Sequence, residues 1–115
     1  MARLELPDGQ WADQVTSPNH RQNRAILSAA ERAQRGSGTF TDWASVVGFQ
    51  MTTAWYVRGD DGKPIDLDES GWDEAPAAIV DAICGKAQEL WRGWNRNRRP
   101  LVPILALSAD TSPVE

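Results

Sequence analysis

The sequence predicts a single small α+β domain over residues 1–100, mostly helical, followed by a flexible tail over residues 101–115. Two patterns predict this class. Residues 2–15 alternate apolar and polar side chains around a turn, and three later segments carry apolar residues every three or four positions. The length of 115 residues provides one hydrophobic core rather than two. We therefore expect an N-terminal β-hairpin followed by about three α-helices.

The N-terminal alternation predicts the hairpin. Leu4 and Leu6 are separated by charged residues, and Pro7-Asp8-Gly9 is a strong turn signal. We expect Trp11 and Val15 to form the apolar side of the second strand. Because a two-stranded ribbon is only marginally stable, it should lie on helices or on another subunit.

Two helices are expected next. Ser17-Pro18-Asn19 predicts a helix start, and this helix should run from about residue 18 to 35, where Gly36 ends it. Its apolar face comprises Ile26, Ala29, Ala30 and Ala33. A capping box of Thr39 and Asp42 opens the second helix. Its apolar stripe comprises Phe40, Trp43, Val47, Met51 and Ala54. Residues 55–57 are compatible with helix or strand, and we favour helix.

The clearest helical period belongs to the last helix, which should begin at Pro76 and end before Pro100. Just before it, Asp68 to Trp72 should make one helical turn, after a short extended piece carrying Ile65 and Leu67. The stripe of the last helix comprises Ile79, Ile83, Ala87, Leu90 and Trp94.

The net charge of −4 conceals blocks of opposite sign. Residues 20–38 carry a net charge of +3, residues 60–83 carry −7, and residues 84–100 carry +4. Such blocks are most often solvated surface, but complementary blocks can also join copies of a chain. If copies associate in this way, we expect the contacts to come from Asp60, Asp61, Asp66, Asp68, Arg96, Arg98 and Arg99.

Residues suited to catalysis or metal binding are sparse, and no catalytic, cofactor or metal site is predicted. His20 is expected on the surface, and Cys84, beside the last apolar stripe, is expected to be a buried thiol. A single cysteine excludes a disulfide framework and a thiolate zinc site. The acidic residues between Asp60 and Glu69 suggest calcium, but Lys63 and Pro64 break the EF-hand register.

Nothing in the sequence predicts export or a membrane span. The N-terminus has no apolar stretch of the secretory type, and the longest nearly apolar run, residues 100–107, is far shorter than the ~20 residues a span needs. We expect a soluble intracellular protein without a membrane partner. Residues 91–99 interleave aromatic residues with arginines, as single-strand binders do. The acidic chain makes nucleic-acid binding the weaker interpretation.

Several segments carry a family resemblance in their order along the chain, over roughly residues 3–95. They are Leu4-Glu5-Leu6-Pro7-Asp8-Gly9-Gln10-Trp11, a basic helix from His20-Arg21, Trp55 at the end of the middle helix, Gly62-Lys63-Pro64-Ile65, and the run from Leu67 to Pro76. In these features the chain resembles the tail assembly chaperones of long-tailed (siphovirus-like) bacteriophages.

The resemblance implies a non-enzymatic role. Proteins of this family bind the long tape-measure protein and keep it soluble while the tail tube assembles around it. A longer, frameshifted form of the chaperone is the second partner implied, and the segment after Pro100 is where the two forms would diverge. The resemblance further implies a place in the cytoplasm of the infected host and absence from the mature virion.

A chaperone for an amphipathic helix needs apolar surface that a partner can reach. Six tryptophans exceed what a core of this size requires. We assign Trp43, Trp55 and Trp94 to the core. The partner-facing residues expected are Trp11, Trp72, Trp91, Leu101, Val102, Ile104 and Leu105. A virion connector or tail-completion protein is the main alternative function, and a small nucleic-acid-binding protein is the second.

Overall fold

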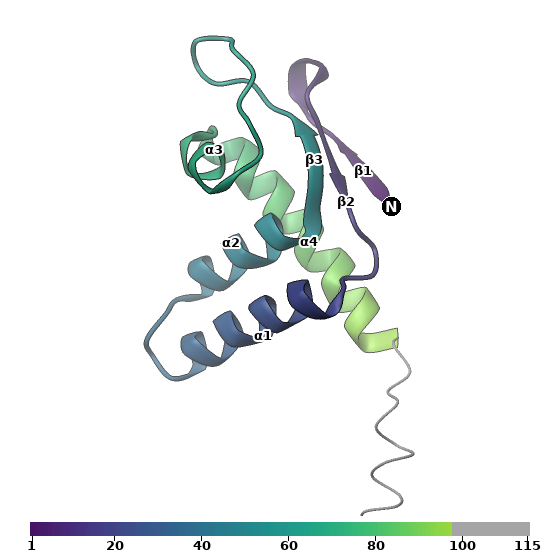
Figure 1. The fold of residues 1–115 in the computed structure, drawn as a ribbon, viewed down its shortest axis with the longest axis vertical. Coiled ribbons are helices and arrows are strands. Elements are labelled where there is room, and N and C mark those ends of the chain that lie inside the picture. The colour runs from purple at the N-terminus through teal and green to yellow at the C-terminus, as the bar shows by residue number, and fades with distance from the viewer. Residues whose placement is uncertain (98–115) are drawn as a thin grey trace, which may run out of the picture.

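The computed structural model describes residues 1–97, which form a three-stranded antiparallel sheet and four α-helices (Figure 1). The mostly helical α+β prediction is confirmed, with one more strand than expected. The residues predicted to form the tail, 101–115, lie outside the described residues. In chain order the elements are β1 (Ala2–Glu5), a 3₁₀ turn (Pro7–Gly9), β2 (Trp11–Gln14), α1 (His20–Gln34), α2 (Phe40–Met51), β3 (Thr52–Tyr56), α3 (Glu69–Glu74) and α4 (Ala77–Asn97).

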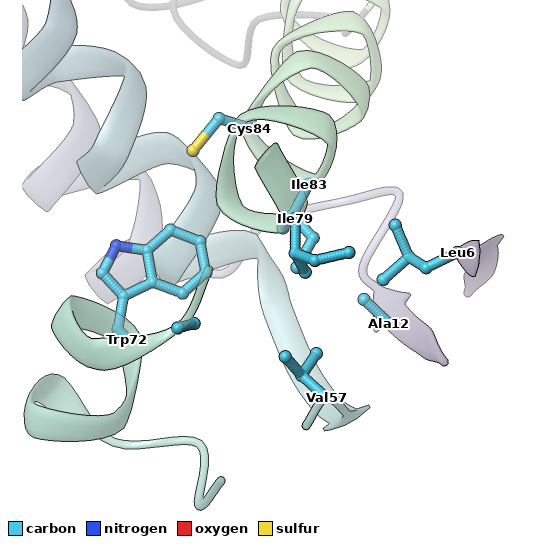
Figure 2. Close-up of a cluster of buried hydrophobic side chains, with 8 residues drawn as sticks. Leu6, Ala12, Val57, Trp72, Ile79, Ile83 and Cys84 are labelled. Carbon is cyan, nitrogen blue, oxygen red and sulfur yellow. The ribbon is translucent and has the colours of Figure 1, made fainter. Parts of the chain in front are cut away.

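The long helix α4 runs behind both the sheet and the antiparallel pair α1–α2 (Figure 1). Two clusters of buried side chains lie along it. The sheet cluster comprises Leu6, Ala12, Val57, Trp72, Ala75, Ile79, Ile83 and Cys84 (Figure 2). The helix cluster comprises Ile26, Ala29, Trp43, Ala44, Val47, Met51, Ala87 and Trp91. One helix therefore contributes to both halves of the core.

The hairpin forms as predicted, but β2 ends before Val15, which is half-buried against the helix cluster. Within the strand, the even-numbered residues are the buried ones. Ala12 and Gln14 are fully buried, whereas Trp11 lies on the outer face. The reason is the turn, in which Leu6 donates its backbone N–H to Gln10 across Pro7–Gly9, so that even-numbered residues face the core. The expectation that Trp11 gives β2 its apolar side was wrong.

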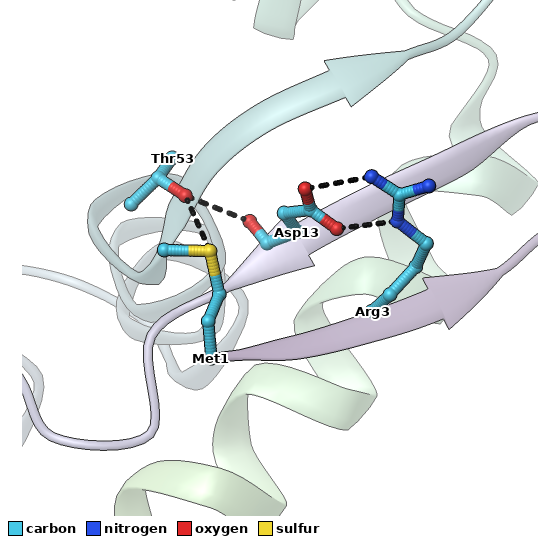
Figure 3. Close-up of polar contacts among 4 residues, drawn as sticks. All are labelled: Met1, Arg3, Asp13 and Thr53. Carbon is cyan, nitrogen blue, oxygen red and sulfur yellow. Dashed lines mark hydrogen bonds and ion pairs between the residues drawn. The ribbon is translucent and has the colours of Figure 1, made fainter.

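The outer face of the sheet is held by a charged pair. Arg3 donates two hydrogen bonds to the carboxylate of Asp13, at 2.7 and 3.0 Å (Figure 3). Its guanidinium lies 4.0 Å from the centre of the Trp11 ring. The hydrogen bonds from Arg3 lower the pKa of Asp13 below its ordinary value. These contacts fix the long Arg3 side chain across the pair β1–β2.

Local signals set the helix ends. Asn19 rather than Ser17 caps α1, through a reciprocal pair of hydrogen bonds with Gln22. The predicted capping box of Thr39 and Asp42 is confirmed for α2. Gly36, with φ of 79°, ends α1 in the left-handed conformation that glycine favours.

The prediction that residues 54–57 continue the second helix was wrong. The helix α2 ends at Met51, where Thr52 adopts an extended conformation and its hydroxyl donates to the carbonyl of Gly48 at 2.7 Å. The chain then pairs with β2 as strand β3. Backbone groups of β2 on the side away from β1 needed partners, and the β-branched Thr52 and Thr53 suit a strand.

Because Gly48 has no side chain, α2 can approach α4 closely at this position. A Cβ atom on Gly48 would lie 2.5 Å from the sulfur of Cys84 and 3.0 Å from the ring of Trp72. Gly85, one residue after Cys84 on α4, is exposed, and a Cβ atom added there would meet nothing within 4 Å. The two helical glycines therefore differ in their surroundings.

We predict opposite effects of Gly48→Ala and Gly85→Ala. Overpacking at Gly48 should lower the free energy of unfolding by about 1–3 kcal/mol. At Gly85 the better helix former should raise it by about 0.5–1 kcal/mol. Urea denaturation followed by circular dichroism measures both. Equal effects of the two substitutions would contradict the close approach at Gly48.

Candidate partner-binding groove

An apolar hollow of about 380 Å³ lies between α1, α2 and α4. Phe40 stands at its edge and is 61% exposed, which is unusual for a large apolar side chain. The residues that line the hollow are Ala30, Ala33, Gln34, Phe40, Trp43 and Arg92. We refer to this surface as the groove.

The secondary structure explains why Phe40 is exposed. It is the first residue of α2, directly after the Thr39 cap, so the helix offers no preceding turn to cover its ring. Its ring centre lies 5.5 Å from that of Trp43. Because the side chains of Ala30 and Ala33 are small, α1 leaves space beside the Phe40 ring. The result is an aromatic edge beside a shallow apolar floor.

Behind the groove, Trp43 is anchored by two neighbours. Trp91 packs edge-on against it with ring centres 5.9 Å apart, and the indole nitrogen of Trp91 donates to the Asn23 side chain at 3.0 Å. The guanidinium of Arg92 lies 5.7 Å from the centre of the Trp43 ring. The indole nitrogen of Trp43 is buried and has no hydrogen-bond partner among residues 1–97.

Arg92 is the one charged residue among the described residues that line the groove. Arg32 and Arg35, in the last turn and at the C-cap of α1, lie on another side of this helix than Ala30, Ala33 and Gln34. Glu31 forms an exposed ion pair with Arg35 at 3.2 Å. An apolar floor bordered by the cation of Arg92 suits a partner that carries a carboxylate beside its apolar residues.

Two of the tryptophans expected to face a partner belong to the core. Trp72 is 5% exposed and donates its indole N–H to Ser45 at 2.9 Å, while its ring stacks on that of Trp55 at 5.8 Å. Trp91 is 9% exposed. Both predictions were wrong, because each indole has a polar partner on another helix. Trp11 is half-buried under Arg3. The other expected contacts, Leu101, Val102, Ile104 and Leu105, lie outside the described residues.

The tryptophans assigned to the core fare better. Trp43 is buried, as predicted, and Trp55 and Trp94 are half-buried against the sheet cluster and the helix cluster respectively. The stripe of fully packed residues on α4 passes through Trp91 instead of Trp94. The exposed aromatic residue that the sequence interpretation missed is Phe40, which was expected in the core stripe of α2.

The acidic residues expected to support self-association gather at one place. They line a hollow of about 590 Å³ together with Lys63 and Glu74. Arg96 lies in the last turn of α4, which has 21 residues, about 30 Å along the helix axis from the first residue of that helix. Contacts between these charges would therefore have to join two copies, which stays a prediction, and Arg98 and Arg99 lie outside the described residues. The acidic set is Asp60, Asp61, Asp66 and Asp68, of which Asp68 also caps α3.

Other sequence candidates also have positions in the structure. His20 is exposed in the first turn of α1. Among residues 1–97, no group of three or more potential ligand residues is placed to hold a metal ion. The aromatic–arginine segment does not present Trp91 to a nucleic acid, because that ring is buried.

Comparison with known proteins gives no relative for this chain. No protein-family model matches it, and neither a curated protein nor a solved structure matches it significantly. Within the described part of the chain, no helix combines the length and the apolar character needed to cross a bilayer.

Cys84 is buried, and burial raises the pKa of its thiol to about 11. The thiol is therefore protonated at neutral pH, which opposes a role as a nucleophile. The nearby charge of Asp81 acts in the same direction.

The shifted pKa predicts a specific loss of stability in alkali. An unfolded thiol ionises near its ordinary value of 9.0, whereas the folded one ionises near 11, so stability is retained below pH 9 and falls as the pH rises toward 11. In that range the folding equilibrium constant of the wild type should fall about tenfold per pH unit more steeply than that of Cys84→Ala. Denaturation at several pH values measures both proteins. Parallel curves would contradict a buried, protonated thiol.

Proposed function

We propose that this protein is a non-enzymatic tail assembly chaperone of a long-tailed bacteriophage, acting in the cytoplasm of the infected host. It binds the tape-measure protein and keeps it soluble during tail assembly. The groove beside Phe40 is the observation that carries the proposal, since it is an exposed aromatic edge over a low apolar floor.

The groove suits a helical partner. Amphipathic helices bind grooves through apolar side chains spaced three or four residues apart. Phe40 offers an exposed aromatic surface to such a stripe, supported from behind by the buried Trp43. Aromatic residues commonly supply much of the binding energy of an interface. The tape-measure segment bound here therefore carries an apolar stripe.

The positive charge at the groove indicates which kind of tape-measure segment binds there. Arg92 in the groove favours a carboxylate beside the apolar stripe. We propose that the bound segment is an amphipathic helix with an acidic border. The frameshifted longer form of the chaperone is the proposed second partner, and its additional residues would follow the domain described here.

The family resemblance supports the same role. Its first segment forms the hairpin, His20-Arg21 begins α1, and the run from Leu67 to Pro76 contains α3. Trp55 was expected to end the middle helix but lies in β3. These segments build the scaffold, while the groove lies on the neighbouring helices.

We predict that Phe40→Asp abolishes most of the chaperone activity without affecting the fold. A carboxylate is favourable in the first turn of α2, so the free energy of unfolding should change by less than about 0.5 kcal/mol. Loss of an aromatic anchor should weaken binding at least about tenfold. The measurement is the soluble fraction of the tape-measure protein in co-expression.

Ala77→Asp is the matched control, since Ala77 is exposed in the first turn of α4, away from the groove. It should leave the soluble fraction at the wild-type value. If the Phe40→Asp protein solubilises its partner as well as the wild type does, the groove is not the binding site.

A second prediction separates the chaperone from the virion-connector alternative. Mass spectrometry of purified phage particles should detect the tape-measure protein and tube subunits but not this chain, because a chaperone leaves before the tail is complete. Detection at the stoichiometry of a structural ring would reject the proposal.

A further inference from the structure

The strand β1 forms an open edge of the sheet. The strand order is β1-β2-β3, and among residues 1–97 no strand or helix lies beyond β1 on the side away from β2 (Figure 1). Arg3 and Glu5 are both exposed. An edge of this kind offers backbone donors and acceptors to another strand.

The register identifies which backbone groups point outward. Leu6 donates its N–H to Gln10, so this pair is hydrogen-bonded, and antiparallel strands alternate such pairs with non-bonded ones. Leu4 therefore bonds to Ala12 of β2. Arg3 and Glu5 form the intervening non-bonded pairs, which directs their N–H and C=O groups to the open edge.

We propose that β1 pairs antiparallel with β1 of a second copy, about a twofold axis through Leu4, to give a continuous six-stranded sheet. In this register Arg3 lies opposite Glu5 of the other copy, and Glu5 lies opposite its Arg3. The outward groups then form four backbone hydrogen bonds, and the Leu4 residues face each other as a non-bonded pair. A register shifted by one residue would lose these hydrogen bonds.

Charge complementarity favours this partner and this register. Both cross-strand pairs join opposite charges on the outer face, where opposite charges stabilise and like charges destabilise a sheet. Arg3 is already oriented by Asp13 and Trp11, so little freedom is lost when a second carboxylate approaches. Four-residue strands make a small contact, so the dimer belongs to the weak, reversible class.

A cysteine on the proposed axis tests the register. The Cα atoms of a non-bonded antiparallel pair lie about 4.5 Å apart, within disulfide range, so oxidised Leu4→Cys should become a covalent dimer. The matched control is Ala2→Cys, on the same face of β1, where the two sulfur-bearing residues would lie about 14 Å apart along the strands. Cys84 is buried and does not compete.

Charge exchange tests the proposal without relying on Leu4. Glu5→Arg and Arg3→Glu each place like charges opposite one another, and each should weaken self-association about tenfold in sedimentation equilibrium. Mixed together, the two variants pair Arg with Glu at every position and should associate as a heterodimer. The Arg96→Glu variant should associate like the wild type.

Several results would overturn the edge pairing. They are a wild type that stays monomeric over the whole concentration series, equal crosslinking of Leu4→Cys and Ala2→Cys, and no association in the mixture of charge variants. Loss of association in Arg96→Glu alone would favour contacts between the acidic and basic blocks. None of these outcomes depends on the tape-measure protein, so the edge pairing and the proposed function are tested separately.

Discussion

The rest of the structure depends on the packing of α4 against both the sheet and the helix pair α1–α2. The first half of α4 closes the sheet cluster and its second half closes the helix cluster. The fully buried Gln14 ties the sheet to its centre, donating an amide hydrogen bond to the carbonyl of Ile83 at 3.0 Å. Because α2 runs directly into β3, the position of α2 on α4 also sets the position of the sheet. The groove and the open strand edge are thus fixed to one frame.

Features governed by neighbours in the sequence could be predicted. A reciprocal pair of hydrogen bonds needs only Thr39 and Asp42, and the end of α1 needs only a glycine at residue 36. The hairpin likewise follows from its turn. Features governed by contacts distant in the sequence could not. The strand β3 exists because β2 required a partner, and no periodicity in five residues contains that information.

The sequence predicted that the candidate site is aromatic, but not which aromatic residues form it. An excess of tryptophan suggested an aromatic contact surface, but burial depends on partners such as Ser45 and Asn23, which lie far from Trp72 and Trp91 in the sequence. The apolar stripe of α4 could continue through either Trp91 or Trp94, and packing against α1 and α2 buried Trp91. The exposure of Phe40 follows from its place in a first turn, which a stripe of apolar residues does not reveal.

The short helix α3 can unfold locally while the rest of the domain stays folded. Six residues are too few to form a stable helix alone, so α3 depends on Trp72, which packs beside Cys84 (Figure 2). Detaching this helix disturbs only the sheet cluster, whereas separating α1 from α2 disturbs the helix cluster. Local unfolding around α3 should therefore cost less free energy than global unfolding. Backbone amides of α3 would then exchange with solvent while the groove stays intact.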